Sequence, residues 1–190
     1  MSEEPISNRI LTIPNLISFI RLATIPVFWW LLLGADDVTA ATILFAVIAT
    51  TDWVDGYLAR RLDQVTTLGK SLDPVADRLM IASAVIAGLI AGIVPPIIGV
   101  TLMVREVYMG VVVLGLAARK GGILEVSWLG KVATFIIYSS VGWFYMAAIP
   151  FLGVLTEPLA WISGVIGLVL YWITAIQYTA AARQKLVRAE

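Results

Sequence analysis

Four aspartates, arranged as two pairs, are the residues of this sequence whose type and spacing could do chemistry. Asp52 and Asp55 stand three positions apart, and Asp73 and Asp77 stand four apart. Each spacing places its two side chains on one face of a helix. The connection between the pairs, roughly residues 59–72, is short enough for an antiparallel helical hairpin, so we expect the two pairs to face each other.

Carboxylates that converge in a place of low dielectric constant repel one another and stay ionised only where cations neutralise them. The sequence contains no histidine and no cysteine. An all-oxygen site favours Mg²⁺ or Mn²⁺, with Ca²⁺ as a third option, and four carboxylates can hold two such ions. Two ions are typical of phosphoryl chemistry, because they stabilise the attacking and the leaving oxygen. In the alternative interpretation, the aspartates pair with Arg60, Arg61 and Arg78 in a purely structural network.

The composition indicates the kind of element that must position these aspartates. Of the 190 residues 60% are apolar and 14% are charged, whereas soluble domains have about 45–50% and about 25%. This composition, with no cysteine and a net charge of zero, excludes a disordered chain, a disulfide scaffold and a basic nucleic-acid binder. Apolar stretches of about 20 residues can span a bilayer as helices. Six stretches qualify: 16–34, 38–58, 72–91, 94–118, 128–149 and 159–181.

The basic residues predict the orientation of these six helices. Nine of the 13 lie beside the spans, on the side that also holds both termini; they are Arg9, Arg60, Arg61, Lys70, Arg119, Lys120, Arg183, Lys185 and Arg188. The three loops on the other side contain no Lys or Arg. Because basic loops stay in the cytoplasm, both termini and the aspartate pairs should lie at the cytoplasmic face.

We expect one all-α membrane domain, with a juxtamembrane segment (1–15), a six-helix bundle (16–182) and a basic tail (183–190). Residues 6–14 could form a short interfacial amphipathic helix, although a disordered tail fits equally well.

The stretch between Asp52 and Asp77 has the pattern D-x2-D-G-x2-A-R-x8-G-x3-D-x3-D. It resembles the signature of the CDP-alcohol phosphatidyltransferase family at all eight fixed positions. The resemblance implies transfer of a phosphatidyl or similar group from a CDP-linked donor to an alcohol, with release of CMP. It also implies two Mg²⁺ or Mn²⁺ ions on Asp52, Asp55, Asp73 and Asp77, with Asp77 as the candidate general base. By the same resemblance, Gly56, Arg60 and Gly69 would line the CDP pocket, and the chain would form a homodimer.

Three further features resemble the glycerol-type branch of this family, which contains phosphatidylglycerophosphate synthases and actinobacterial-type cardiolipin synthases. They are the opening stretch 9–22, the pair Arg105–Glu106 and the pair Gly130–Lys131. Arg105 and Lys131 are candidates for an anion pocket on the acceptor side. The alternative for Arg105 is a structural pair with Glu106 or Asp77.

Two acceptors, glycerol-3-phosphate and phosphatidylglycerol, fit this branch. Phosphatidylglycerophosphate synthases commonly carry a second lysine where this chain has Ala133, and often a lysine where it has Arg78. A phosphodiester acceptor carries less charge than a phosphomonoester and needs fewer cations. These positions favour phosphatidylglycerol, while glycerol-3-phosphate stays open and inositol phosphate fits less well.

A divalent-cation transporter is the alternative from a different functional class. Transport sites usually lie near the bilayer midplane between paired halves. Here the acids are expected near one face, and no inverted repeat is visible in the sequence. The complete signature also argues against an inactive scaffold. We therefore expect an enzyme in a bacterial-type cell membrane, with its site facing the cytoplasm.

Overall fold

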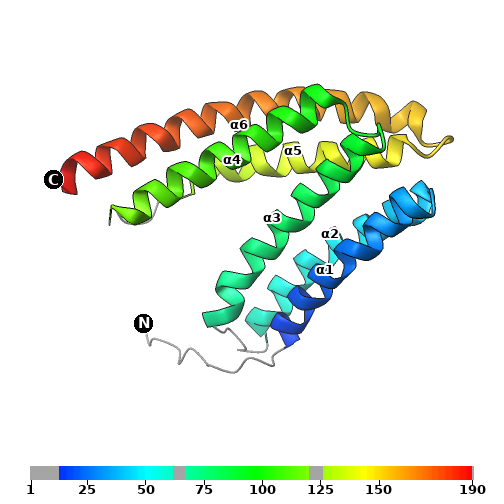
Figure 1. Cartoon of the computed structure of the whole chain (residues 1–190), viewed down its shortest axis with the longest axis horizontal. Helices are drawn as coiled ribbons and strands as arrows, with labels where there is room; N and C mark the ends of the chain where they lie inside the picture. The colour runs from blue at the N-terminus through cyan, green and yellow to red at the C-terminus, as the bar shows by residue number, and fades with distance from the viewer. Residues whose placement is uncertain (1–12, 62–66, 120–125, 190) are drawn as a thin grey trace. The chain divides into compact units, whose positions relative to one another are not determined.

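The computed structural model describes residues 13–61, 67–119 and 126–189, and within these it describes the side chains of 18–50, 75–119 and 126–186. All regular structure in these ranges is helical (Figure 1). The helices fall into two compact units, Met1–Ala87 and Gly88–Glu190.

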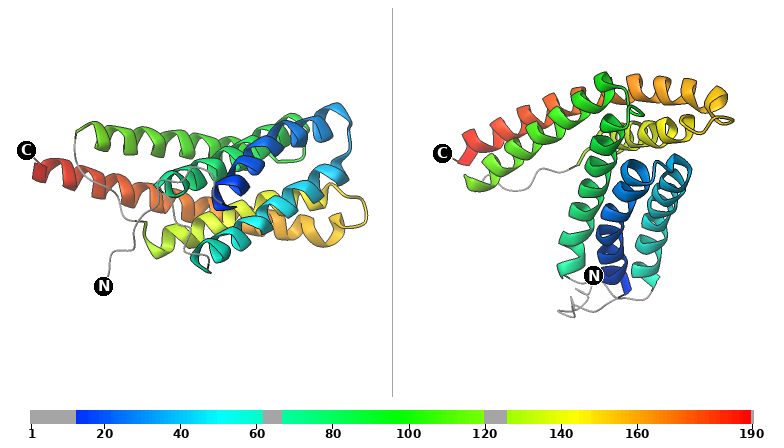
Figure 2. Two further views of the ribbon diagram at one scale, coloured as in Figure 1. Left: turned by 90° about the horizontal axis from the view of Figure 1, so that it is seen from below. Right: turned by 45° about the vertical axis from the view of Figure 1, so that its right-hand side comes forward.

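The first unit contains α1 (Ile13–Trp29), which continues into the π-helical turn η1 (Trp30–Gly34), then α2 (Val38–Arg61) and most of α3 (Thr67–Ile90). Asp37 starts α2, because its Oδ1 accepts a hydrogen bond from the backbone N–H of Ala40 at 2.8 Å. Trp29 Nε1 donates to Ser83 Oγ at 2.6 Å and so ties α1 to α3. The start of α1, the end of α2 and the start of α3 lie at the same end of this unit (Figures 1 and 2).

The second unit contains α4 (Pro96–Ala118), α5 (Trp128–Ala147) and α6 (Gly153–Ala189). Helices α5 and α6 pack along their length, and α4 packs on α6. Gly167 permits the close approach of α5 and α6, because a Cβ at this position would lie 2.8 Å from the backbone nitrogen of Ile137. Gly92 has a φ of 71° in the turn before α4, a conformation that favours glycine.

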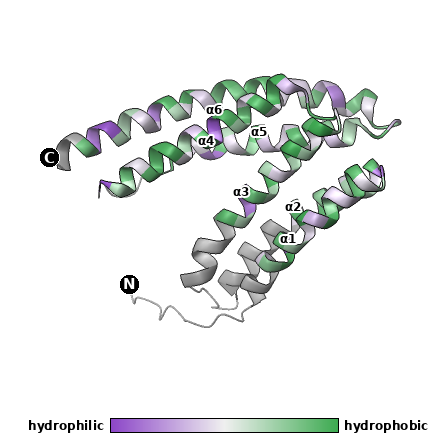
Figure 3. Cartoon of the chain, in the orientation of Figure 1, coloured by the Kyte–Doolittle hydropathy of each residue, from purple (hydrophilic) through white to green (hydrophobic). Residues whose placement is uncertain are grey.

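Two helices are long and apolar enough to cross a bilayer, Pro96–Ala118 and Gly153–Leu186, among the residues that the structure describes. Their outward faces present apolar side chains such as Val111, Leu114 and Ile176. Figure 3 shows apolar residues over most of the described helices and hydrophilic residues toward the end of α6. The helices agree with a helical membrane protein, while the six-span count stays a prediction.

At three places the helices extend beyond the predicted apolar spans. The connection expected over 59–72 is shorter, because α2 continues to Arg61 and α3 begins at Thr67. The break expected before residue 159 is largely helical, since α6 begins at Gly153 and contains Pro158. The expected tail 183–190 belongs to α6 as far as Ala189. At 1.5 Å per residue α6 is about 55 Å long, more than a hydrocarbon core of about 30 Å, so a basic end outside the bilayer can stay helical.

Candidate functional site

Helices α2 and α3 carry the two aspartate pairs, as the spacing predicts. Asp52 and Asp55 lie in α2, and Asp73 and Asp77 lie in α3. The side chains of Asp52, Asp55, Gly56, Arg60, Gly69 and Asp73 lie outside the described residues, so their mutual approach stays a prediction. The interfacial segment expected over 6–14 also lies almost wholly outside them, since α1 begins at Ile13.

Asp77 is described in full, and its partner comes from α1. Arg21 Nη1 donates to Asp77 Oδ1, which makes an ion pair between α1 and α3. The Arg21 side chain is only 4% exposed, whereas that of Asp77 is 39% exposed. A buried guanidinium without a counter-charge would be strongly destabilising, so the pair explains why an arginine is tolerated here. The exposed part of Asp77 leaves its carboxylate accessible.

Arg21 lies inside the first predicted span, 16–34, and was assigned no role at the site from the sequence. The structural alternative for the aspartates also omitted it, because it considered only Arg60, Arg61 and Arg78. Arg21 lies 56 positions before Asp77, so no local periodicity connects the two. The signal in the sequence was the unexplained arginine in an apolar stretch, since such a residue is expected to have a partner.

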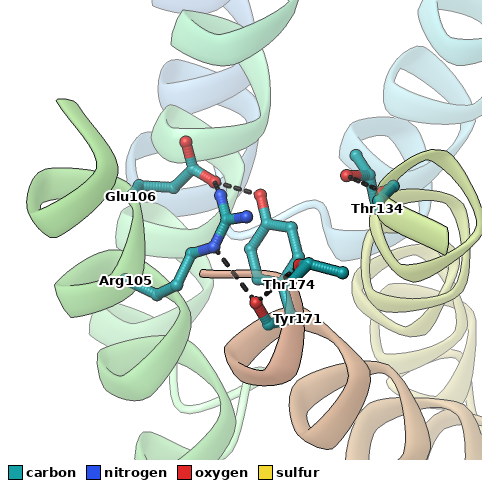
Figure 4. Close-up of polar contacts among 6 residues, drawn as sticks. Arg105, Glu106, Thr134, Tyr171 and Thr174 are labelled. Atoms are coloured by element: carbon teal, nitrogen blue, oxygen red, sulfur yellow. Dashed lines mark hydrogen bonds and ion pairs between the residues drawn. The ribbon is translucent and has the colours of Figure 1, made fainter. Parts of the chain in front are cut away.

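Arg105 takes part in a buried polar network in the second unit (Figure 4). Its Nη1 donates to Glu106 Oε1 at 3.2 Å, and its Nε donates to the carbonyl oxygen of Tyr171 at 3.4 Å. Its guanidinium carbon lies 3.5 Å from the centre of the Tyr171 ring, and the Tyr171 hydroxyl donates to Glu106 Oε1. The structural alternative for Arg105, a pair with Glu106, is therefore present. The prediction that Arg105 binds an acceptor anion stays open.

Lys131 lies in the first turn of α5, directly after a tightly fixed residue. Ser127 Oγ accepts from the backbone N–H of Gly130 at 3.1 Å and so caps the helix. The Tyr178 hydroxyl of α6 lies against this turn and accepts from the Ser127 N–H at 2.9 Å. Lys131 itself is exposed.

Comparison with known proteins identifies the family. The sequence model of the family described as CDP-alcohol phosphatidyltransferase matches residues 11–177. The chain belongs to the CDP-alcohol phosphatidyltransferase family. The family predicted from the eight signature positions is therefore confirmed, and the match extends over most of both units.

Several curated proteins are similar to this chain. Cardiolipin synthase (CMP-forming) of Streptomyces coelicolor is 35% identical over 97% of the chain and 88% of its own length. A probable phosphatidylglycerophosphate synthase of Mycobacterium tuberculosis is 34% identical, over 92% and 83%. CDP-diacylglycerol–glycerol-3-phosphate 3-phosphatidyltransferase of Bacillus subtilis is 33% identical, over 73% and 79%. No solved structure matches the chain. These relatives confirm the predicted phosphatidylglycerol and cardiolipin branch.

Proposed function

We propose that this protein transfers the phosphatidyl group of CDP-diacylglycerol to a glycerol-type alcohol and releases CMP. The observation that carries the proposal is the family match over residues 11–177, together with a signature that is complete on two consecutive helices. The named relatives support the glycerol-type acceptor, because they are cardiolipin and phosphatidylglycerophosphate synthases.

The donor set fits a hard divalent cation. Helices α2 and α3 each contain two carboxylates about one turn apart, and the chain has no thiol or imidazole to favour a softer metal. We propose that Asp52, Asp55, Asp73 and Asp77 hold two Mg²⁺ or Mn²⁺ ions. When bound, such ions would compensate the charge of the diphosphate and stabilise the attacking and the leaving oxygen.

Asp77 is the proposed general base. Its carboxylate is partly exposed. It can take the proton of the acceptor hydroxyl if that hydroxyl binds within hydrogen-bond distance of it. The hydroxyl oxygen then forms a bond to the phosphatidyl phosphorus, and the bond from this phosphorus to the phosphate oxygen of CMP breaks. The buried guanidinium of Arg21 holds the Asp77 carboxylate in place through the ion pair. The acceptor supplies the nucleophile, so the protein needs none of its own.

The CDP pocket is proposed at Gly56, Arg60 and Gly69. Glycine leaves room for a nucleotide beside the backbone of a helix. The planar guanidinium of arginine can bind two oxygens of a diphosphate at once. Arg60 stands in the last turn of α2, where the predicted topology places the cytoplasmic face and therefore access for a nucleotide.

We propose phosphatidylglycerol as the acceptor, which would give cardiolipin. Ala133 and Arg78 support this choice, since both replace lysines that are frequent in phosphatidylglycerophosphate synthases. The second candidate is glycerol-3-phosphate, which the name of the B. subtilis relative favours. Arg105 and Lys131 are proposed to bind the anionic group that either acceptor carries.

The proposed setting is a cell membrane of bacterial type, crossed by six helices with both termini in the cytoplasm. The distribution of basic residues supports this orientation.

A homodimer is the proposed assembly. In the second unit, a Cβ at Gly110 or Gly115 would meet nothing within 4 Å among the described residues, so α4 has room for the close approach of another helix.

Identification of the lipid product tests the acceptor. Purified protein is incubated with CDP-diacylglycerol and Mg²⁺, together with phosphatidylglycerol, glycerol-3-phosphate or inositol phosphate, and the lipids are analysed by mass spectrometry. We expect cardiolipin from phosphatidylglycerol. Phosphatidylglycerophosphate alone would replace the proposed acceptor with the second candidate, and an inositol lipid would overturn the glycerol-type branch. Magnesium flux into liposomes without any lipid product would favour the transporter.

A further inference from the structure

Two tyrosines of α6 contact the two elements that carry the proposed acceptor cations. Tyr171 and Tyr178 are seven positions apart, which is close to two helical turns, so they lie on the same face of α6 and about 10 Å apart along its axis. Tyr171 contacts Arg105 and Glu106 of α4. Tyr178 contacts the residues that begin α5, directly before Lys131. All of these residues lie in the second unit.

Tyr171 holds the Arg105 guanidinium from two directions. Its ring lies under the guanidinium at 3.5 Å, and its carbonyl oxygen accepts from Arg105 Nε. The Tyr171 hydroxyl also donates to the Glu106 oxygen that accepts from Arg105 Nη1 (Figure 4). Arg105 is only 5% exposed, and these contacts compensate the cost of burying its charge. The hydrogen bonds to Glu106 and Tyr171 use two of the five N–H donors of Arg105. The network therefore orients the guanidinium and leaves three N–H donors for an anion.

Tyr178 holds the start of α5. Its hydroxyl accepts from the Ser127 N–H and lies 3.1 Å from Ser127 Oγ, which in turn caps Gly130. The hydroxyl also occupies the space beside Gly130, where an added Cβ would collide with it. Glycine at 130 is therefore required by the position of Tyr178, and the backbone before Lys131 has little freedom.

We propose that Tyr171 and Tyr178 are positioning residues that fix Arg105 and Lys131 for the anionic group of the acceptor. This inference rests on the proposed function and extends it, because α6 becomes the element that sets the geometry of acceptor binding. Neither tyrosine was identified from the sequence, since each acts through a residue on another helix. The chemistry recognised is a phosphate ester, which glycerol-3-phosphate and phosphatidylglycerol both contain.

The test separates acceptor binding from every other effect. Wild type, Tyr171→Phe and Tyr178→Phe are assayed for CMP release with each acceptor, while CDP-diacylglycerol and the acceptor are varied in turn. Tyr108→Phe is the matched control: it removes a tyrosine hydroxyl that bonds Thr179 at 2.8 Å, also between α4 and α6, and this bond involves neither Arg105, Glu106 nor Ser127. Tyr171→Leu extends the series, because it removes the ring under Arg105 as well as the hydroxyl.

We expect each Phe variant to raise the KM of the acceptor about tenfold, a ratio within the range of a lost hydrogen bond to a charged or capping group. The KM of CDP-diacylglycerol should stay within about twofold of wild type in each Phe variant. In the control Tyr108→Phe, the KM of both substrates should stay within the same range. Tyr171→Leu should raise the KM of the acceptor more than Tyr171→Phe does. A structural defect would instead reduce the active fraction and so lower kcat for both substrates alike.

Two outcomes would overturn the inference, and they are distinguishable. If wild type releases no CMP with either acceptor, the proposed function fails and the inference fails with it. If wild type is active but both tyrosine variants keep the acceptor KM, the positioning role alone is wrong. Should a tyrosine variant not fold, Glu106→Gln and Ser127→Ala alter the opposite partner in each contact and must show the same selective rise in KM.

Discussion

Arg21 of α1 and Asp77 of α3 form an ion pair across 56 positions of the sequence. The buried member is the arginine, while the aspartate keeps part of its carboxylate exposed. The last aspartate of the signature is therefore oriented from outside the signature. This relationship makes α1 part of the proposed active site, which the spacing of the aspartates alone does not indicate.

The pair predicts coupling between the two positions. Arg21→Gln and Asp77→Asn should each destabilise the protein by about 1–3 kcal/mol, because each removes one partner of a partly buried charged bond. The double variant should lose less than the sum, since it leaves no unpaired charge. Thermal unfolding in detergent measures the cycle. Strictly additive losses would show that the two residues are not coupled in the folded protein.

The proposed metal site predicts that the carboxylate of Asp55 is essential for activity and dispensable for folding. Asp55→Asn should abolish CMP release while the protein still elutes as a folded species in detergent, because an amide binds divalent cations more weakly than a carboxylate. Removal of divalent ions with EDTA should stop the wild-type reaction, and added Mg²⁺ should restore it. Full activity of Asp55→Asn, or of the chelated wild type, would contradict the metal assignment.

The contact between Gly130 and Tyr178 predicts a specific rescue. Gly130→Ala should destabilise the protein by about 1–3 kcal/mol, because the new methyl group collides with the Tyr178 hydroxyl. Tyr178→Phe removes this hydroxyl, so the double variant should recover part of the loss. Recovery stays partial, since the ring carbon that bears the hydroxyl would still lie 3.1 Å from the methyl group. The check is the melting temperature of the three variants, and no recovery would place the strain elsewhere.

The absence of cysteine from the sequence permits a clean test of topology. Glu157→Cys and Arg183→Cys each introduce a single thiol at an exposed position, one near each end of the apolar part of α6. A membrane-impermeant maleimide should label Cys at 157 in intact cells and Cys at 183 only after the cells are opened. Labelling in the reverse order would show that the positive-inside assignment is inverted.

The helices of the site could be predicted from the sequence because the four aspartates follow helical spacing within apolar stretches. Arg105 and Glu106 were also identified, because this pair resembles the glycerol-type branch of the family. The ends of the helices were less predictable. Pro158 suggested a break, yet a proline near the beginning of a helix displaces few hydrogen bonds, and α6 passes through it.

Residues that act across helices could not be found from the sequence. Arg21, Tyr171 and Tyr178 each act on a residue of another helix, at separations of 51 to 66 positions. Neither tyrosine differs by type or spacing from an ordinary aromatic residue in a membrane helix. Their roles depend on which faces the helices turn toward one another, and this packing is not encoded in any local pattern.

The central claim is tested most directly by measuring CMP and lipid product together from the purified protein. With CDP-diacylglycerol, phosphatidylglycerol and Mg²⁺, wild type should release one CMP for each new phospholipid, and Asp77→Asn should release none. A folded Asp77→Asn protein with wild-type turnover would contradict the assignment of the base. A folded wild-type protein that forms neither CMP nor lipid with any glycerol-type acceptor would contradict the account as a whole.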